Sequence, residues 1–323
     1  MAKIFVTRKI PEIGLTMLRD AGHEVVVSEK DGVLTKEELH AAVSEQPYDA
    51  LLTLLSDPVD DELLSHAPNV KIVSNYAVGY NNINVPAMTE RNVMVTNTPD
   101  VLNDSVAEFT LALIFAITKR IPEAERFARA GKYEGWAPEL LLGVDLVGKK
   151  LGIVGAGRIG ATVAERAQKG LGMDIIYHDI KPSEKLESMV TCSYCATLEE
   201  LLQQADVVTL HVPLLDATRH LMNAERLAQM KPTAYLVNTS RGPVVDEAAL
   251  AEALANQTIA GAAIDVFEFE PAITESLKSL ENVVITPHIA SATTETRDKM
   301  AVLAAQAIID CMEGKTPEHV VKG

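Results

Sequence analysis

A glycine-rich turn in the middle of the chain constrains the fold more than any other feature of the sequence. A short apolar run, Leu151–Val154, leads into Gly155-Ala-Gly-Arg-Ile-Gly160, and a helix-like stretch follows from Ala161 to Gly170. The first glycine permits a tight turn, the second lets the backbone approach a pyrophosphate, and the third lets the helix pack on the strand. The pattern therefore predicts the start of a dinucleotide-binding unit.

An acidic residue at the end of the next apolar run completes this pattern. Asp179 follows Gly160 at the spacing where a carboxylate accepts hydrogen bonds from the adenosine ribose. The same carboxylate would repel a 2′-phosphate, so we expect the chain to prefer NAD(H) over NADP(H). Only Lys181 could offset that repulsion, so binding of NADP(H) is possible but disfavoured. The predicted cofactor residues of this region are Gly155, Gly157, Arg158, Ile159, Gly160 and Asp179, with the Arg158 and Ile159 amides meeting the pyrophosphate at the helix N-terminus.

Composition and charge favour a folded chain that acts on small molecules. The 323 residues are 47% hydrophobic and 23% charged, which is typical of a globular protein of about two domains. The formal net charge of −16 predicts no nucleic-acid partner and no anionic membrane partner. The first residues predict a strand rather than a signal peptide, and the longest apolar stretch, Thr110–Thr118, is too short to span a bilayer. We therefore expect a cytoplasmic location.

Strand and helix patterns alternate in two series along the chain. The first series predicts strands at Lys3–Thr7, Glu24–Val27, Ala50–Leu55, Lys71–Asn75 and Val93–Thr96, with helices at Ile10–Ala21, Thr35–Val43 and Asp60–Ala67. The second series predicts six strands, at Leu151–Val154, Asp174–His178, Val207–His211, Ala234–Asn238, Gly261–Asp265 and Val283–Thr286. One helix from about Asp104 to Ala130, kinked at Pro122, joins the two series, and a helix at Thr294–Glu313 closes the chain.

The closing helix decides the expected domain organisation. Strands separated by helices predict parallel sheets with right-handed crossovers, and a helix beyond the second series packs most economically on the first. We therefore predict an α/β, two-domain chain. A Rossmann-type NAD-binding domain, residues 104–289, is inserted into a discontinuous flavodoxin-like substrate-binding (catalytic) domain made of residues 1–103 and 290–323.

The three cysteines, Cys192, Cys195 and Cys311, are too few for a disulfide framework. Cys192-Ser-Tyr-Cys195 matches the spacing of a redox pair or half a zinc site, but the sequence offers no second such pair to complete a zinc tetrad. We expect two incidental thiols on a short strand and no metal site.

Three polar residues follow the last three predicted strands. Arg241, Glu270 and His288 should meet at one sheet edge, because the carboxyl ends of parallel strands lie together. Reduction of a 2-oxo acid needs a cation that holds the carboxylate and polarises the ketone, and a proton donor for the developing alkoxide. Arg241 fits the first role and His288 the second, while Glu270 would favour the imidazolium form of His288.

Each of these assignments has an alternative. Arg241 could instead cap a turn or pair with Asp246, and His288 could be a structural histidine. Glu268 is a rival for Glu270 because it lies two residues away, and the choice between them rests on the family resemblance given below. Asp265, at a strand end, could hydrogen-bond the nicotinamide amide or serve only a structural purpose.

Seven stretches of the sequence carry a resemblance to a known family. They are Val78–Asn84, Asn97–Leu102, Ser105–Glu108, Gly155–Gly160, Asn238–Gly242, Asp265–Phe267 and Thr286–His288. Together they make the chain resemble the D-isomer-specific 2-hydroxyacid dehydrogenases from end to end. The resemblance implies that Arg241, Glu270 and His288 form the catalytic set. It implies substrate binding by Leu55, Val78 and Gly79, and further cofactor contacts by Val106, Val212, Pro213, Thr239, Ser240, Asp265, His288 and Ala290.

Within the family, the chain is most similar to glyoxylate/hydroxypyruvate reductases. This likeness rests on Leu54–Asp57, Thr98–Asp104 and the Trp136-Ala-Pro138 loop. In those relatives a Trp of this loop can reach the active site of the partner subunit, so the resemblance implies a homodimer in which Trp136 contacts substrate. The alternative is that Trp136 only anchors the dimer interface. Ala290 departs from the Gly that many relatives carry there.

The sequence as a whole predicts an NAD(H)-dependent oxidoreductase. We expect reduction of a small 2-oxo acid, glyoxylate or hydroxypyruvate, to the D-2-hydroxy acid by hydride transfer, with His288 as the acid/base. One alternative is another small anion on the same fold, such as pyruvate/D-lactate or phosphite. The other is a non-enzymatic, NADH-sensing corepressor-like protein.

Overall fold

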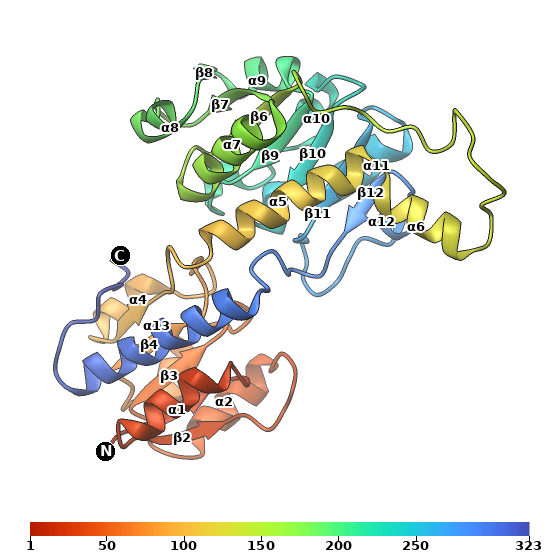
Figure 1. Cartoon of the computed structure of the whole chain (residues 1–323). Coiled ribbons are helices and arrows are strands. Elements are labelled where there is room, and N and C mark those ends of the chain that lie inside the picture. The colour runs from red at the N-terminus through yellow and green to blue at the C-terminus, as the bar shows by residue number, and fades with distance from the viewer. Residues whose placement is uncertain (323) are drawn as a thin grey trace. The chain divides into compact units, whose positions relative to one another are not determined.

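The computed structural model describes residues 1–322 and divides the chain into two compact α/β units (Figure 1). The first unit combines Met1–Leu102 with the chain from Ala292 onward, and the second unit is Asn103–Ser291. The chain thus leaves the first unit once and returns to it once. None of the described helices is long and apolar enough to cross a membrane.

The first unit is built on a five-stranded parallel sheet with the strand order β2-β1-β3-β4-β5, which is the flavodoxin-like order. Its strands are β1 (Lys3–Val6), β2 (Glu24–Val27), β3 (Ala50–Thr53), β4 (Ile72–Asn75) and β5 (Met94–Thr96). Its helices are α1 (Glu12–Asp20), α2 (Lys36–Ser44), α3 (Asp61–His66), α4 (Val85–Glu90) and α13 (Thr294–Met312). All five strands were predicted. The short helix α4 was not, because six residues carry little helical periodicity.

The core of the first unit lies between its sheet and the helices on both faces. On one face, α2 and α3 bury Leu39 and Leu63 against Leu51 and Val73 of the sheet. On the other face, the closing helix α13 packs on α1 and β4, as the sequence predicted. The Ser74 hydroxyl donates a hydrogen bond to the Ala304 carbonyl, which fixes this helix on the strand.

The second unit contains a seven-stranded parallel sheet with the order β12-β11-β10-β9-β6-β7-β8. Its strands are β6 (Lys150–Val154), β7 (Asp174–His178), β8 (Cys192–Tyr194), β9 (Val207–Leu210), β10 (Tyr235–Asn238), β11 (Gly261–Ile264) and β12 (Val283–Ile285). Its helices are α5 (Asn103–Thr118), α6 (Ile121–Arg129), α7 (Arg158–Leu171), α8 (Glu184–Met189), α9 (Leu198–Gln204), α10 (Ala224–Gln229), α11 (Glu247–Ala255) and α12 (Glu275–Lys278). Side chains of α5 and α7 cover one face of the sheet, and those of α9, α10 and α11 cover the other.

The six strands predicted for this sheet did not include β8, although a short strand was expected at Cys192 and Cys195. The seventh strand, β8, is an edge strand that pairs with β7 and contains Cys192, while Cys195 follows directly after it. The three residues of β8, two partly buried and one exposed, give no apolar run long enough to assign the strand to the sheet. Both cysteines are free thiols, and burial raises the pKa of each.

The prediction of one kinked helix between residues 104 and 130 was also wrong. The chain forms two helices, α5 and α6, separated at Arg120, which has a φ of 55°. Pro122 cannot donate to the Thr118 carbonyl, and its ring would clash with that group in a continuous helix. The Thr118 carbonyl accepts the Val144 N–H at 3.0 Å instead. The proline therefore ends one helix and lies in the first turn of the next.

A small residue allows α1 and α13 to pack closely in the first unit. A methyl group at Gly14 would lie 2.8 Å from the Ala301 carbonyl oxygen. Gly14→Ala should therefore destabilise the chain by about 1–3 kcal/mol through overpacking, although alanine has the better helix propensity. The matched control is Gly170→Ala in α7, where a methyl group meets nothing within 4 Å. Denaturant unfolding followed by circular dichroism should show a lower free energy of unfolding for Gly14→Ala and no such loss for Gly170→Ala. Equal stability of the two variants would contradict this packing.

Candidate functional site

The glycine turn lies where the strand order of the second sheet reverses. Strand β6 is paired with β9 on one side and with β7 on the other, so the crossover connections leave it in opposite directions. In open α/β sheets, ligands bind outside the carboxyl ends of the strands at such a point. The carboxyl edge of this sheet is therefore the candidate site.

The three glycines of the turn have distinct structural roles. Gly155 has a φ of 95°, which favours glycine, and a methyl group on Gly160 would lie 2.2 Å from the Gly155 carbonyl oxygen. A methyl group on Gly157 would meet no described atom within 4 Å, and no described side chain caps α7 at this residue. The turn thus presents open backbone at a helix N-terminus, which fits a pyrophosphate.

Asp179 joins the end of β7 to the glycine turn. Its Oδ2 accepts the Ala156 N–H at 2.7 Å, and its Oδ1 accepts the Ile180 N–H at 2.7 Å. Each carboxylate oxygen can accept a second hydrogen bond. The carboxylate is therefore held beside the turn with capacity left for ribose hydroxyls.

Arg241 follows β10 and lies next to the loop that bears the predicted carboxylate. A methyl group on Gly242 would lie 1.8 Å from the Phe267 carbonyl oxygen, so only glycine permits this approach of the two loops. The Arg241 Nη1 donates to the Ser240 carbonyl at 2.7 Å. Burial lowers the pKa of the Arg241 guanidinium, while the Glu270 carboxylate opposes that effect, and a guanidinium stays protonated. Asp246 caps α11 by accepting the Ala249 N–H.

Glu270 and His288 are in direct contact. The His288 Nδ1 lies 2.9 Å from Glu270 Oε2, and the two side chains are 26% and 30% exposed. Burial alone would raise the pKa of Glu270, but the hydrogen bond and charge of His288 outweigh it, so this pKa is lowered. With Nδ1 bound to the carboxylate, Nε2 is left to exchange a proton. The rival carboxylate, Glu268, lies 2.6 Å from His220 instead.

The backbone of His288 is held in an uncommon conformation by Asp265. His288 has a φ of 55°, and its N–H donates to the Asp265 carbonyl at 2.8 Å. The buried Asp265 carboxylate also accepts the Ile289 and Ala290 N–H groups, at 2.9 and 2.7 Å, and the Thr286 hydroxyl. Burial raises the pKa of Asp265, and these hydrogen bonds oppose that effect. The contacts support the structural alternative for Asp265.

Glu247 is a positioning residue that the sequence did not reveal. It begins α11, where a carboxylate is ordinarily solvated, yet it is 4% exposed. Its carboxylate accepts the Glu268 and Thr274 N–H groups at 2.7 Å each. Because these amides flank Glu270, Glu247 fixes the loop that carries Glu270. Only the long-range fold places Glu247 there, so no local pattern could have indicated it.

The other predicted cofactor residues of the second unit lie at the same edge or beside it. Thr239 and Ser240 follow β10, Val212 and Pro213 come after β9, Ala290 lies beyond β12, and Val106 is in α5. The hydroxyls of Thr239 and Thr110 are 3.0 Å apart, which links α5 to this edge.

The predicted substrate residues of the first unit follow β3 and β4. The Val78 carbonyl accepts from Asn97 at 2.8 Å, and the Gly79 carbonyl accepts from Asn75 at 3.0 Å. The N–H groups of Val78 and Gly79 make no hydrogen bond to another described residue. This arrangement leaves two adjacent amides available for an anion. Leu55 lies in the loop that Asp57 holds by accepting the Leu54 N–H at 2.7 Å.

Trp136 lies on an extended arm that leaves α6 and returns to β6, residues 131–149 (Figure 1). The indole is 84% exposed, and Tyr133, Leu142 and Val147 are exposed on the same arm. Exposed apolar side chains that gather in one patch can mark a protein–protein contact.

The chain also resembles known proteins along nearly its whole length. Residues 111–290 match the family described as "D-isomer specific 2-hydroxyacid dehydrogenase, NAD binding domain". The chain is 46% identical to a glyoxylate reductase of Thermofilum pendens, over 99% of this chain and 94% of that protein.

The chain belongs to the D-isomer-specific 2-hydroxyacid dehydrogenase family.

Solved structures of the family agree with this assignment. A glyoxylate/hydroxypyruvate reductase of Sinorhizobium meliloti, NADPH-dependent and solved with NADP and malonate, has a TM-score of 0.86 at 33% identity, covering 99% of this chain and 96% of that one. A D-lactate dehydrogenase of Aquifex aeolicus, solved with NAD and lactic acid, has a TM-score of 0.86 at 27% identity, covering 99% of both chains. The protein is therefore an oxidoreductase that acts on 2-hydroxy acids with a nicotinamide cofactor, and the corepressor-like alternative is not supported.

The contact between Glu270 and His288 should make stability depend on pH. Because the pKa of Glu270 is lowered on folding, its carboxylate stabilises the fold above its ordinary pKa of 4.5, and this contribution is lost as the pH falls through the lowered value. The free energy of unfolding of wild type should exceed that of Glu270→Gln by roughly 1 kcal/mol at neutral pH, and this difference should shrink below pH 4.5.

The measurement is denaturant unfolding of both proteins between about pH 3 and 7, a range that covers the titration of carboxyl groups. Glu275→Gln is the control, because that carboxylate is 87% exposed and pairs only with Lys278. A difference for Glu270→Gln that stays constant across the whole range would contradict the interpretation.

Proposed function

We propose that this chain reduces glyoxylate or hydroxypyruvate to the D-2-hydroxy acid, with His288 as the acid/base and NADH as the preferred reductant. The observation that carries the proposal is the 2.9 Å contact between His288 Nδ1 and Glu270, made at the sheet edge that also bears Arg241 and the glycine turn. The glyoxylate reductase relative supports the substrate class.

The residues divide the chemistry among them. When bound, the nicotinamide supplies the hydride. The Glu270 carboxylate holds His288 Nδ1, so the ring delivers its proton from Nε2 to the oxygen that becomes the hydroxyl. The Arg241 guanidinium binds and polarises the 2-oxo acid, because a planar cation matches its oxygens. The free amides of Val78 and Gly79 bind the carboxylate. In the direction of oxidation, His288 takes the proton back.

The cofactor would be held by the glycine turn and Asp179. The open backbone at Gly157 fits the pyrophosphate, and Asp179 accepts hydrogen bonds from the ribose. Thr239, Ser240 and Ala290 follow β10 and β12 at the same edge and would contact the nicotinamide. Structures of relatives contain NAD in one case and NADP in another, so family membership alone does not choose between them. The charge of Asp179 supports NADH for this chain, since it repels a 2′-phosphate.

The exposed arm supports a homodimer. Tyr133, Trp136 and Leu142 would be buried against a second copy, which accounts for their exposure in a single chain. In such a dimer Trp136 would contact the substrate of the partner subunit.

Asp179→Ser should shift the cofactor preference. Removing the negative charge should raise the ratio of kcat/KM for NADPH to that for NADH by about tenfold or more, because about 1.4 kcal/mol of repulsion is relieved. Asp174→Ser is the matched control, since Asp174 is exposed at the opposite end of the same strand. Steady-state kinetics with both cofactors measures the ratio. An unchanged ratio for Asp179→Ser would remove this residue from the cofactor site.

The substrate proposal is tested by NADH oxidation with glyoxylate, hydroxypyruvate, pyruvate and 2-oxobutyrate, followed by absorbance. We expect the highest kcat/KM for glyoxylate or hydroxypyruvate. A higher value for pyruvate, or NAD reduction by phosphite with no turnover of the oxo acids, would replace the proposal with the corresponding alternative.

A further inference from the structure

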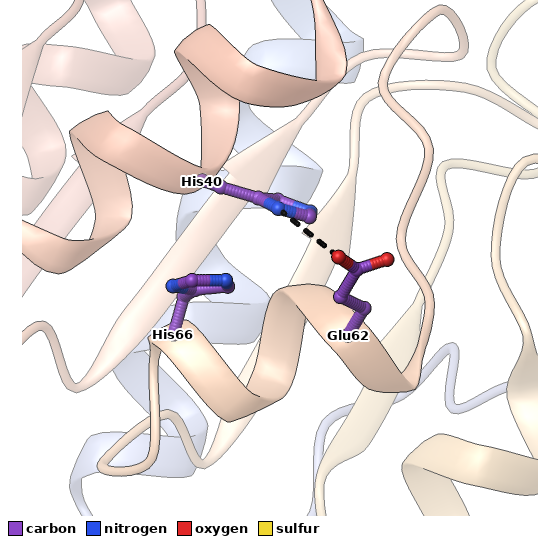
Figure 2. A group of neighbouring side chains, drawn as sticks. All are labelled: His40, Glu62 and His66. Atoms are coloured by element: carbon purple, nitrogen blue, oxygen red, sulfur yellow. Dashed lines mark ion pairs between the residues drawn. The ribbon is translucent and has the colours of Figure 1, made fainter.

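A cluster of two histidines and one glutamate lies in the first unit, apart from the residues described above (Figure 2). His40 is on α2, and Glu62 and His66 are four residues apart on α3, so they share one face of that helix. One potential ligand atom from each residue lies within 4.8 Å of the other two. Among residues 1–322, this is the one group of histidine, cysteine and acidic side chains with such spacing.

A hydrogen bond at Ser44 prepares His66 to bind a metal ion. The Ser44 hydroxyl donates to the His40 carbonyl at 2.7 Å, so it can only accept from the His66 Nδ1, which lies 3.2 Å away. Nδ1 therefore carries the proton, and Nε2 keeps its lone pair. Metal-binding histidines are oriented in this way, by donating the other ring N–H to a neighbouring oxygen.

His40 is a mostly buried ring without hydrogen bonds to other described residues. Its side chain is 11% exposed, and its Nε2 is buried with no partner. Its Nδ1 lies 3.9 Å from Glu62 Oε1, which is too long for a hydrogen bond. Nδ1 is therefore the ring nitrogen that faces Glu62 and is available to a metal ion.

We propose that His40, Glu62 and His66 bind one Zn²⁺ or a similar divalent transition-metal ion, which links α2 to α3. Imidazole nitrogens and a carboxylate are ligands for Zn²⁺ at about 2.1 Å, which puts tetrahedral ligand atoms about 3.4 Å apart. The 3.9 Å gap between His40 and Glu62 is close to that spacing. The two rings are stacked, with centroids 4.6 Å apart and planes 27° apart, so they must open slightly for both nitrogens to point at one ion. Water completes the tetrahedron.

Lys36 contacts the Glu62 carboxylate and leaves its other oxygen available to a metal ion. Its ammonium lies 2.7 Å from Glu62 Oε2, while Oε1 is the oxygen that faces His40. The ion pair with Asp60, at 2.9 Å, holds the lysine on the outer side of the carboxylate. Glu62 can therefore bind a metal ion while it keeps Lys36, but the positive charge weakens the site.

The experiment is a zinc titration of the metal-stripped full-length chain, by competition with a chromophoric zinc indicator. Wild type should bind one more Zn²⁺ per chain than His40→Gln/His66→Gln. Glu62→Gln, which alters an exposed side chain, should weaken the affinity for this ion at least about tenfold. The matched control is His319→Gln, because His319 also lies 3.9 Å from a carboxylate but has no third ligand. Other zinc-binding groups, including Glu270 with His288, are the same in all four proteins and cancel in the comparison.

Two further readouts decide the assignment. Wild type with bound Co²⁺ should show the absorption spectrum of a tetrahedral site, and the double variant should lack it. Lys36→Met should bind zinc about tenfold more tightly than wild type, because a nearby positive charge is removed. Equal stoichiometry and affinity in wild type and the double variant would overturn the proposal. An unchanged affinity in both Glu62→Gln and Lys36→Met would overturn the role of Glu62.

Discussion

The hydrogen bond between Glu270 and His288 is the interaction on which the proposed active site depends. It fixes which ring nitrogen is free, and it holds the imidazole in one orientation. The contact exists only because two loops meet at one edge of the second sheet. Asp265 holds the loop of His288 through its amides, and Glu247 holds the loop of Glu270 in the same way. The two residues proposed for the chemistry are therefore positioned by carboxylates that have no proposed part in it.

Polar side chains hold main-chain groups of neighbouring loops in both units. In the first unit, Asp57 accepts the Leu54 N–H, and Asn75 and Asn97 bind the carbonyls of Gly79 and Val78. In each case a buried or half-buried polar side chain at a strand end satisfies main-chain groups of the next loop. Such groups are costly to bury without partners, so each loop is held in one conformation. Rigid loops at the carboxyl edge are what precise placement of a hydride acceptor and a proton donor requires.

Much of the architecture could be predicted from the sequence because its signals are local. Apolar runs marked the strands, and the glycine turn followed by Asp179 marked the nucleotide site. The rule that ligands collect at the carboxyl edge led to Arg241, His288 and a nearby carboxylate, which the family resemblance assigned to Glu270. Local signals indicated a short strand at Cys192 and Cys195 but did not assign it to the sheet, because β8 lacks an apolar run. They also failed for Pro122, whose effect depended on a new partner for the Thr118 carbonyl.

Long-range contacts could not be predicted in this way. The roles of Glu247 and Asp265 depend on amides that lie 21 to 27 residues away in the chain. The cluster on α2 and α3 is of the same kind, because His40 and Glu62 meet only after two helices pack. The expectation of no metal site rested on cysteine and histidine spacing in the sequence, which does not reveal such a meeting.

The measurement that tests the account most directly is turnover of glyoxylate by His288→Gln, together with its affinity for NADH. If His288 donates the proton, kcat should fall by about 100-fold or more, because general acid catalysis contributes about 10²–10⁴-fold, while NADH binding stays within about twofold. Turnover close to that of wild type, with NADH binding intact, would contradict the assignment of His288 as the acid.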